Sequence, residues 1–291
     1  MLKVSIKPSH ETIGYARYLK YIKFTSKTSM IADMLSEFVL PKLCARFDRI
    51  KILDIGGGTG WIDNRILQFS EEQQKEIQIT ILEPAENAAH DLYGRFEGFE
   101  NVHILEERFE DWDKEKNECF DIVIASHVMY YFRDRKNFVE RCLARVNAGG
   151  MLVIVAVSIS ILQNDIYQTI LPAFRRQSNL PRTDVYDGDF GFAEEIEHIL
   201  FSLNQVFTLK VLPSKLFLPA STVLSALSGL GSEEVVEQDL FTTFSFLWHF
   251  PPEVLAGQIE LWRDFLEPLV RQHAGLNINY EDKLIFVTME E

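Results

Sequence analysis

Cysteine is scarce in this 291-residue sequence, and the few cysteines present form no cross-linking or metal-binding pattern. Cys44, Cys119 and Cys142 are widely spaced, with no CxxC pair, no zinc-like grouping with histidine and no disulfide framework. We expect reduced, buried thiols in a cytoplasmic protein. The sequence also lacks an HExxH motif and any metal-spaced set of carboxylates, so we predict that no metal is required.

Positive charge is in short supply as well. Lys and Arg number 29 against 43 Asp and Glu, which gives a formal net charge of −14 at pH 7. A surface of that sign repels nucleic-acid phosphates and anionic lipid headgroups and suits cations and amines better. The longest nearly unbroken apolar run, 151–162, is too short to cross a bilayer. We expect a small-molecule partner, no nucleic acid, no membrane, and a monomer or weak dimer.

The remaining composition is that of a globular protein, with 47% hydrophobic and 25% charged residues. From residue 50 to residue 158, short apolar runs alternate with helical stretches, which predicts parallel strands with right-handed crossovers. Residues 147–150, Asn-Ala-Gly-Gly, predict a turn or the end of a helix. The strands are expected at 50–55, 77–83, 102–105, 120–126 and 151–158, and the helices at 61–69, 85–96 and 136–146.

The two ends of the chain are expected to add to this sheet. Residues 11–48 and about 219–275 look helical, whereas 207–218 and 283–289 read as strands. The fold class predicted is α/β: a Rossmann-like, doubly wound, seven-stranded sheet with N-terminal helices and a helical substrate-binding insert. The expected parts are a helical cap (1–48), a cofactor-binding core (49–218), a substrate or lid insert (219–275) and a final core strand (276–291).

The most informative motif is KILDIGGGTGW, residues 51–61, in which an apolar strand runs into glycines and then into a helix. The dinucleotide pattern G-x-G-x-x-G fails, because its last glycine would fall on Trp61. An acid followed by glycines at alternate positions fits instead, and this pattern resembles the first motif of class I S-adenosylmethionine-dependent methyltransferases. The alternative is a tight turn that binds nothing. The residues expected to contact S-adenosyl-L-methionine, or the product S-adenosyl-L-homocysteine, are Asp54, Gly56, Gly57, Gly58, Thr59 and Gly60.

Two further segments are expected to complete a cofactor site. Glu83 ends the second expected strand, where its carboxylate can accept hydrogen bonds from both ribose hydroxyls, although it can also be a surface acid. In EERFEDW, residues 106–112, the place that often holds an adenine-binding Asp in this superfamily holds Arg108. We assign adenine contacts to Phe109 and Asp111, and the alternative is an acidic, solvated loop.

The fourth expected strand ends in SHVMYY, residues 126–131, beside the place of the transferred methyl group in this fold. His127 is the catalytic candidate, because a histidine can act as a base near neutral pH or can hold the substrate by a hydrogen bond. A structural histidine is the alternative. Tyr130 and Tyr131 are predicted to wall the substrate pocket, or to pack under the sheet edge.

Taken together, these residues make the chain similar to the histamine N-methyltransferase family. KILDIGGGTG, WIDNRIL, Glu83-Pro84, ENV from Glu100 and MYY from Met129 carry the resemblance. It implies a class I methyltransferase domain with a smaller substrate region and methyl transfer to a ring nitrogen. It also implies that Ser126 contacts the cofactor and that Tyr15 lies in the pocket.

The positions that would recognise histamine differ from the family. Its substrate glutamate, glutamine and asparagine fall on Thr28, His127 and Asp282, or close to it. Buried polar contacts discriminate strongly between substrates, so we expect a different amine or heterocycle. The aromatic pocket candidates are Tyr15, Tyr18, Phe241, Phe244 and Phe246.

Three functions remain open from the sequence. The first is N-methylation of a small molecule, the second is O- or carboxyl-methylation, and the third is a non-catalytic regulatory protein that binds S-adenosylmethionine. Methylation of DNA adenine or protein glutamine ranks below these, because SHVMYY stands where an NPPY-like motif is typical.

Overall fold

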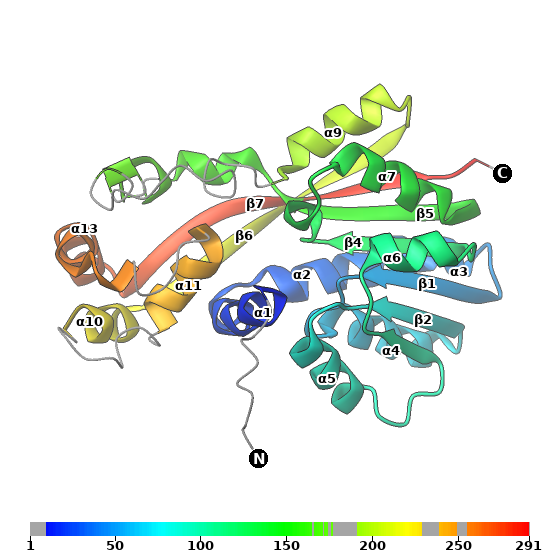
Figure 1. Ribbon diagram of the computed structural model, residues 1–291, viewed down its shortest axis with the longest axis horizontal. Helices are drawn as coiled ribbons and strands as arrows, with labels where there is room; N and C mark the ends of the chain where they lie inside the picture. Colours follow the sequence, from blue (N-terminus) through cyan, green and yellow to red (C-terminus); the bar gives the residue numbers. More distant parts are fainter. Residues whose placement is uncertain are drawn as a thin grey trace, which may run out of the picture.

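A mixed seven-stranded sheet runs through the middle of the computed structural model (Figure 1). The structure describes residues 10–164, 166–170, 172–173, 176, 191–228, 239–248 and 255–290. The strand order is β3-β2-β1-β4-β5-β7-β6. The strands are β1 (Arg49–Ile55), β2 (Glu76–Leu82), β3 (Val102–Leu105), β4 (Phe120–Ser126), β5 (Val146–Val157), β6 (Phe207–Pro219) and β7 (Gly275–Thr288).

Strands β1 to β5 pair in parallel, and helices cover both faces of the sheet. In β4, Ile122 and Ile124 face one layer of helices while Val123 and Ala125 face the other, which explains why its apolar run is continuous. The predicted Rossmann-like α/β fold is confirmed. Helices α2 (Lys27–Met34), α3 (Leu40–Cys44) and α4 (Trp61–Gln73) cover one face, and α6 (Phe109–Glu115), α7 (Arg135–Ala144) and α9 (Ala193–Ser202) cover the other.

Of the two alternatives for residues 147–150, the turn is wrong, because these residues lie inside β5. The preceding helix α7 does end as expected, at Ala144. The strand then begins at Val146, and its register against β4 shifts before Met151. Gly149, with φ of +74°, allows this irregularity, so the two glycines mark a bulge within the strand.

Strands β6 and β7 are longer than the rest of the sheet. Residues 282–288 of β7 pair antiparallel with β5, and the last pair joins Val157 to Asp282. Beyond that pair, β6 and β7 continue as a two-stranded antiparallel ribbon without β5 (Figure 1). Asp282 therefore lies where this ribbon extends beyond the sheet.

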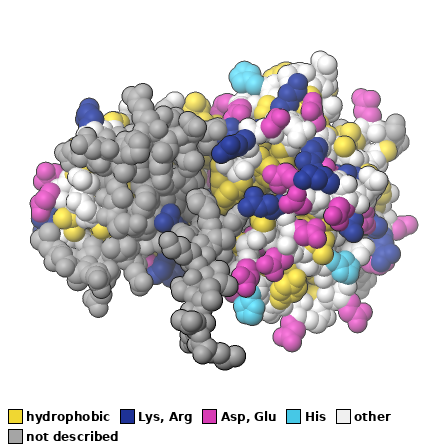
Figure 2. All heavy atoms as spheres, viewed as in Figure 1, with side chains coloured by type: hydrophobic (Ala, Val, Ile, Leu, Met, Phe, Trp, Pro, Cys, Tyr) yellow, Lys and Arg dark blue, Asp and Glu magenta, His cyan; other side chains and the backbone are white. Residues whose placement is uncertain are grey.

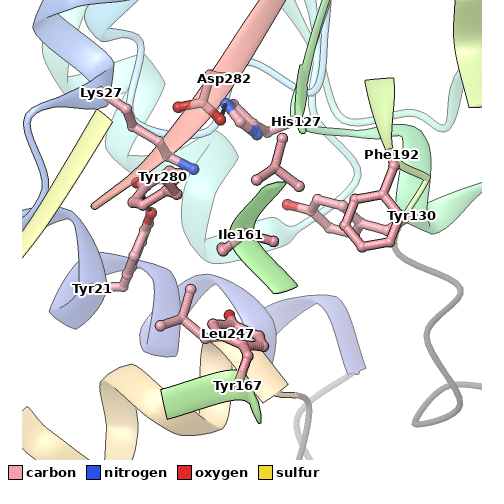
Figure 3. A pocket seen from close by; sticks show the side chains of 11 residues that line it. Tyr21, Lys27, His127, Tyr130, Ile161, Tyr167, Phe192, Leu247, Tyr280 and Asp282 are labelled. Atoms are coloured by element: carbon pink, nitrogen blue, oxygen red, sulfur yellow. Dashed lines mark hydrogen bonds and ion pairs between the residues drawn. The ribbon is translucent and has the colours of Figure 1, made fainter. Parts of the chain in front are cut away.

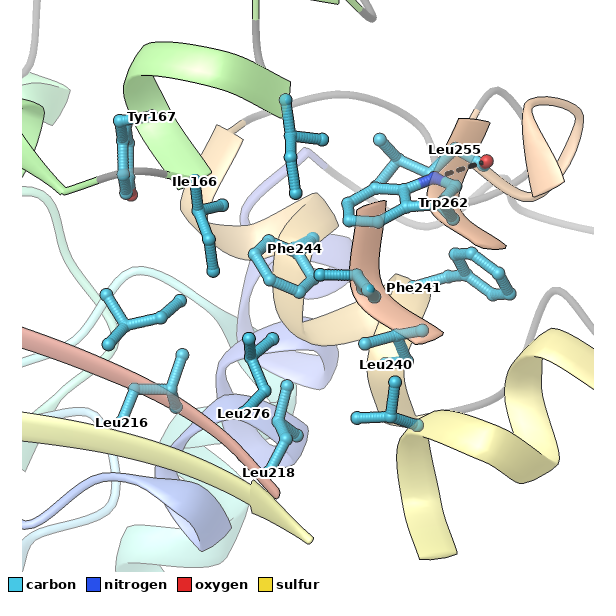
Figure 4. Packing of buried hydrophobic residues seen from close by; sticks show 14 of the residues in the cluster. Ile166, Tyr167, Leu216, Leu218, Leu240, Phe241, Phe244, Leu255, Trp262 and Leu276 are labelled. Carbon is cyan, nitrogen blue, oxygen red and sulfur yellow. Dashed lines mark hydrogen bonds between the residues drawn. The ribbon is translucent and has the colours of Figure 1, made fainter. Parts of the chain in front are cut away.

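Helices between β6 and β7 pack on this hairpin and form a second apolar core. They are α10 (Ala220–Ser228), α11 (Asp239–Trp248) and α13 (Ile259–Gln272). Trp262 lies at the centre of this core beside Phe241 and Phe244, and its ring N–H donates to the carbonyl oxygen of Leu255 at 2.9 Å (Figure 4). The described helices of the 219–275 segment thus share one apolar core with the extended ends of β6 and β7, with α1 and with residues 161–173.

The N-terminal helix α1 (His10–Tyr21) packs against α11 and against α5 (Glu86–Arg95), so it bridges the two parts of the molecule (Figure 1). Tyr15, Tyr18 and Tyr21 form a ladder along it, with ring centroids 6.4 and 6.5 Å apart. This ladder follows the three-residue spacing seen in the sequence.

The described surface agrees with the composition. Acidic and basic side chains are interspersed over the part of the face in Figure 2 that the structure describes. The three cysteines are free thiols. Among the described residues, no helix is long and apolar enough to cross a membrane.

Candidate functional site

The glycine-rich loop joins β1 to α4 through backbone conformations that favour glycine. Gly56, Gly58 and Gly60 have φ angles of +78°, +56° and +69°. The N–H of Gly56 donates to the carbonyl oxygen of Leu82 at 2.7 Å, which ties the loop to β2. A Cβ added to Gly58 would meet no atom closer than Tyr18 Cε1 at 3.7 Å, so this edge of the loop faces open space.

Glu83 follows β2 and is held beside the loop by two backbone N–H groups. The N–H of Gly58 donates to Oε2 and the N–H of Ala85 donates to Oε1, both at 2.9 Å. Burial raises the pKa of the Glu83 carboxyl group, while these two hydrogen bonds act in the opposite direction. A carboxylate oxygen can accept more than one hydrogen bond, so Glu83 keeps acceptor capacity for a ligand.

A cavity of about 770 Å³ lies at these strand ends, where open α/β sheets bind ligands. It brings together most of the predicted site residues from the loop, from β2, from β4 and from the N-terminal helices. The predicted residues on its wall are Tyr15, Tyr18, Thr28, Asp54, Gly56, Gly57, Gly58, Thr59, Glu83, Phe109, Ser126, His127, Tyr130 and Tyr131.

Several predicted residues lie elsewhere. Gly60 begins α4 and faces Leu92 and Phe96 of the neighbouring segment. Asp111 is on the exposed side of α6, with its carboxylate 2.9 Å from the Lys114 ammonium group. Phe241 and Phe244 are fully buried in the second apolar core. Phe246 belongs to α11, but its side chain lies outside the described residues.

The large cavity fits an adenosyl cofactor. Its volume is within the range of small-molecule sites, about 300–1,000 Å³. Bare glycine backbone forms one wall, and Glu83 presents its carboxylate one strand away. Oδ1 of Asp54 is buried and has no hydrogen-bond partner among the described residues, which leaves an acceptor for an ammonium group.

Two carboxyl groups are buried together behind the loop. Asp54 and Asp63 are 2% and 0% exposed. Burial, and then the charge of Asp63, raise the pKa of Asp54 well above its ordinary value. Burial also raises the pKa of Asp63, to about 7. The folded protein therefore retains a proton here that the unfolded chain has already lost near pH 4.

Replacing Asp63 by asparagine is expected to flatten the dependence of stability on pH. Because the folded pKa is raised, the stability linked to this proton is complete below the unfolded pKa near 4 and is lost as pH rises through about 7. The free energy of unfolding of the wild type, measured with urea, should fall between pH 5.5 and pH 8 more than that of D63N. Asp111→Asn, at an exposed carboxyl group, should retain the wild-type slope, and an equal slope in D63N would contradict this account.

A second cavity of about 70 Å³ adjoins the first (Figure 3). Lys27, His127 and Tyr130 line both cavities, so these three residues mark their boundary. Asp282 and Tyr280 line the small cavity from β7, beside Tyr21 of α1 and Ile161, Tyr167, Phe192, Val157 and Leu247. The small cavity is mainly aromatic and apolar, with one polar end.

His127 and Asp282 face each other at that polar end (Figure 3). Nε2 of His127 lies 3.6 Å from Oδ1 of Asp282, beyond hydrogen-bond distance, and neither atom has another partner among the described residues. The backbone of His127 has φ of +54°, rare outside glycine, and its N–H donates to the carbonyl oxygen of Val155 at 2.9 Å. A strained, anchored backbone thus points the imidazole into the cavity.

The electrostatics of this end favour an uncharged imidazole. Burial, followed by the charge of Lys27, holds the pKa of His127 well below its ordinary value. Burial raises the pKa of Asp282, whereas Lys27 and the hydroxyl of Ser214, which donates to Oδ2, lower it. His127 is therefore neutral at physiological pH and able to accept a hydrogen bond.

The sequence reasoning missed Lys27, Tyr21 and Tyr280 as cavity residues. Two signals could have found the tyrosines. Tyr280 and Asp282 are two apart in a strand and so share a face, and Tyr21 continues the helical face of Tyr15 and Tyr18. Lys27 had no such signal, because a lysine near a helix start is normally solvated.

Comparison with known proteins agrees with the geometry. Residues 53–152 match the family model described as a methyltransferase domain. No curated protein matches the sequence. Among solved structures, a candidate methyltransferase from Bacillus halodurans is 14% identical, with a TM-score of 0.50, and the alignment covers 87% of this chain and 99% of that one.

Two other solved structures are similar to this chain. A candidate sarcosine dimethylglycine methyltransferase from Galdieria sulphuraria is 12% identical, with a TM-score of 0.50 and coverage of 88% of this chain and 85% of that one. The plantazolicin methyltransferase BpumL, solved with a desmethylPZN analog and SAH, is 11% identical, with a TM-score of 0.48 and coverage of 95% and 90%. Residues 53–152 are thus a methyltransferase domain, and this match, together with the glycine loop, supports an S-adenosylmethionine-dependent methyltransferase.

Proposed function

We propose that this methyltransferase acts on a small molecule and methylates a nitrogen of an amine or heterocycle held where the small cavity opens onto the large one. The observation that carries the proposal is the shared boundary: Lys27, His127 and Tyr130 line both cavities. A donor in the large cavity and a ring in the small one would meet at these residues. The resemblance to histamine N-methyltransferases supports a nitrogen acceptor and stays a prediction.

The proposed donor contacts follow from the wall of the large cavity. Glu83 accepts hydrogen bonds from the ribose, the Gly56–Gly58 backbone lies against the chain of the donor, and Oδ1 of Asp54 accepts from its ammonium group. Phe109 lies beside the adenine. The bound cofactor supplies an electrophilic methyl group on a sulfonium. The task of the protein is to align the acceptor behind that methyl group and to exclude water.

His127 has two suitable properties for an acceptor nitrogen. Its uncharged imidazole does not repel a sulfonium, and its unpartnered Nε2 can accept a hydrogen bond from an N–H group. A nitrogen becomes much more acidic once it bonds the methyl carbon, so a weak base suffices to take its proton. In the methyl transfer that the bound donor would support, His127 would take the proton that the acceptor nitrogen loses, and Asp282, 3.6 Å away, would stabilise the imidazolium.

The acceptor itself is found by direct screening. The purified chain is incubated with methyl-labelled S-adenosylmethionine and a library of small amines, azoles, phenols and carboxylic acids, and products with one added methyl are identified by mass spectrometry. Label on nitrogen supports the proposal, whereas label on oxygen favours the O- or carboxyl-methyltransferase alternative. Binding of S-adenosylhomocysteine without any transfer would favour a regulatory protein.

Replacing His127 by glutamine is expected to lower kcat for the identified acceptor by about 100-fold, the usual contribution of a positioned base. Glutamine retains hydrogen bonding but cannot take a proton. Because the wild type loses its neutral imidazole only well below pH 6.5, its kcat should fall on the acid side alone, and this acid limb should be absent from H127Q. Steady-state rates from pH 5 to pH 8 measure both effects.

His198→Gln is the matched control, because His198 is exposed on α9 and lines neither cavity. It should retain the wild-type rate and pH profile. Unchanged turnover and an unchanged acid limb in H127Q would remove His127 from the reaction.

A further inference from the structure

Lys27 places an amine inside the acceptor cavity. It is the first residue of α2, is 7% exposed, and lines both cavities. Its Nζ lies 4.8 Å from the centroid of the Tyr21 ring. Among the described residues, this ammonium group makes no ion pair and no hydrogen bond. A buried charge without a counter-ion destabilises the fold, and a ligand of opposite charge relieves that cost.

Most of the surrounding hydroxyl groups already have partners. The charge of Asp282 acts on Lys27, but no ion pair joins the two side chains among the described residues: Oδ2 of Asp282 accepts from Ser214, and its Oδ1 lies 3.6 Å from Nε2 of His127. The hydroxyls of Tyr21 and Tyr280 are hydrogen-bonded to each other at 2.7 Å, and Tyr280 is also 2.9 Å from the hydroxyl of Thr25. The Lys27 ammonium group therefore lies at the polar end of the cavity, beside Asp282, His127 and aromatic walls, without a hydrogen-bonded counter-ion among the described residues (Figure 3).

We propose that Lys27 binds a carboxylate of the acceptor molecule, so that the substrate is an aromatic or heteroaromatic ring bearing an acidic group. This inference rests on the proposed function and narrows it. A cationic amine such as histamine would face the Lys27 ammonium group at the same boundary and be repelled. A ring with a carboxylate would pair with Lys27 while a ring nitrogen meets His127.

The alternative partner is the α-carboxylate of the donor, because Lys27 also borders the large cavity. The position of Lys27 favours the acceptor. Its ring contact is with Tyr21 and its main charge interaction is with Asp282, and both of these line the small cavity but not the large one. The test below separates the two partners.

The charge of Lys27 is itself sensitive to pH. Burial lowers its pKa to about 8, and Asp282 acts in the opposite direction. The groups that face it are Asp282 from β7, His127 from the end of β4, and the Tyr21 and Tyr280 hydroxyls. His127 is neutral near pH 7 and the tyrosine pKa values are raised, so Lys27 is the group expected to lose charge between pH 7 and pH 9.

The experiment measures binding without turnover. Three proteins are saturated with S-adenosylhomocysteine: wild type, Lys27→Met and Lys23→Met. Calorimetry then measures the binding of imidazole, pyridine and indole compounds that bear an acetate, aminoethyl or methyl group. Methionine retains the length and apolar packing of Lys27, and Lys23 is an exposed neighbour. For at least one ring, the compound that bears the acetate group should bind wild type at least about 10-fold tighter than the compound that bears the aminoethyl group. The affinity of the acetate compound for K27M should be about 100-fold lower than for wild type.

Other readouts complete the test. K27M should bind S-adenosylhomocysteine as wild type does, K23M should match wild type throughout, and acetate affinity for wild type should fall from pH 7 to pH 9. Three results would overturn the inference: no acetate binds on any ring, the aminoethyl partner binds tighter, or K27M loses S-adenosylhomocysteine affinity instead of acetate affinity. Failure of the proposed function is seen separately, as labelled methyl on oxygen or no methyl transfer in the library screen.

Discussion

Replacing Glu83 by glutamine is expected to weaken S-adenosylhomocysteine binding by about 100-fold, the equivalent of about two charge-assisted hydrogen bonds. The carboxylate accepts the N–H groups of Gly58 and Ala85 and, in the proposed site, both ribose hydroxyls. Glutamine has one acceptor oxygen, and its NH₂ group would face one of these two backbone donors. The change therefore removes ligand contacts and loosens the loop together. Isothermal calorimetry measures the affinity directly.

Two controls separate the ribose contact from general damage. Glu86→Gln changes an exposed acid three residues further along, at the start of α5, and should leave the affinity unchanged. A product analogue without the ribose 2′-hydroxyl should already bind wild type more weakly, and E83Q should reduce its affinity less than that of the full product. Equal affinity of E83Q and wild type for S-adenosylhomocysteine would remove Glu83 from the cofactor site.

The placement of the glycine loop beside Glu83 could be predicted because both are close together in the sequence. The loop and Glu83 belong to one β-α-β unit, and consecutive parallel strands end at the same edge of the sheet. The register of β1 against β2 pairs Ile55 with Leu82, which sets Gly56 next to Glu83. The spacing of the glycines and the length of the two strands were sufficient to place this part.

Helix phase explains why only one of the two residues assigned to adenine, Phe109 but not Asp111, lies on the cavity wall. Helix α6 begins at Phe109, so Phe109 and Trp112, three residues apart, turn into the core and their rings pack 6.3 Å apart. Asp111, between them, is carried to the outside. The sequence did not reveal where this short helix begins, and one residue of phase decides which side chain meets the cavity.

The acceptor cavity could not be derived from local patterns. Lys27, His127 and Asp282 come from α2, from the end of β4 and from β7, and only the packed fold brings them together. His127 and Asp282 were singled out from strand-end position and family resemblance, whereas Lys27 was not. Phe244 was predicted to line the pocket but packs on Trp262 in the second apolar core. The sequence cannot distinguish these two cases, because an apolar helical face has the same pattern in both.

Gly60→Ala is expected to lower the free energy of unfolding by about 2–5 kcal/mol, from left-handed strain of about 1–2 kcal/mol and overpacking of about 1–3 kcal/mol. Gly60 has φ of +69°, and its added Cβ would lie 2.7 Å from Phe96 Cε2 and 2.8 Å from Leu92 Cδ2. Both side chains are buried, so neither can move away freely. Because Gly60 sets the angle between loop and helix, S-adenosylhomocysteine affinity should fall with stability. Urea unfolding and calorimetry report the two effects.

Gly94→Ala makes the same chemical change within α5 and isolates the cause. A Cβ there meets nothing within 4 Å, so no clash arises. Alanine also favours a helix over glycine by about 0.5–1 kcal/mol, so this variant should be as stable as wild type or slightly more stable. If G60A unfolded at the same urea concentration as G94A, the loop would tolerate a side chain at this φ. The loop would then not require glycine at this position, contrary to the proposal that its bare backbone forms the wall of the cofactor site.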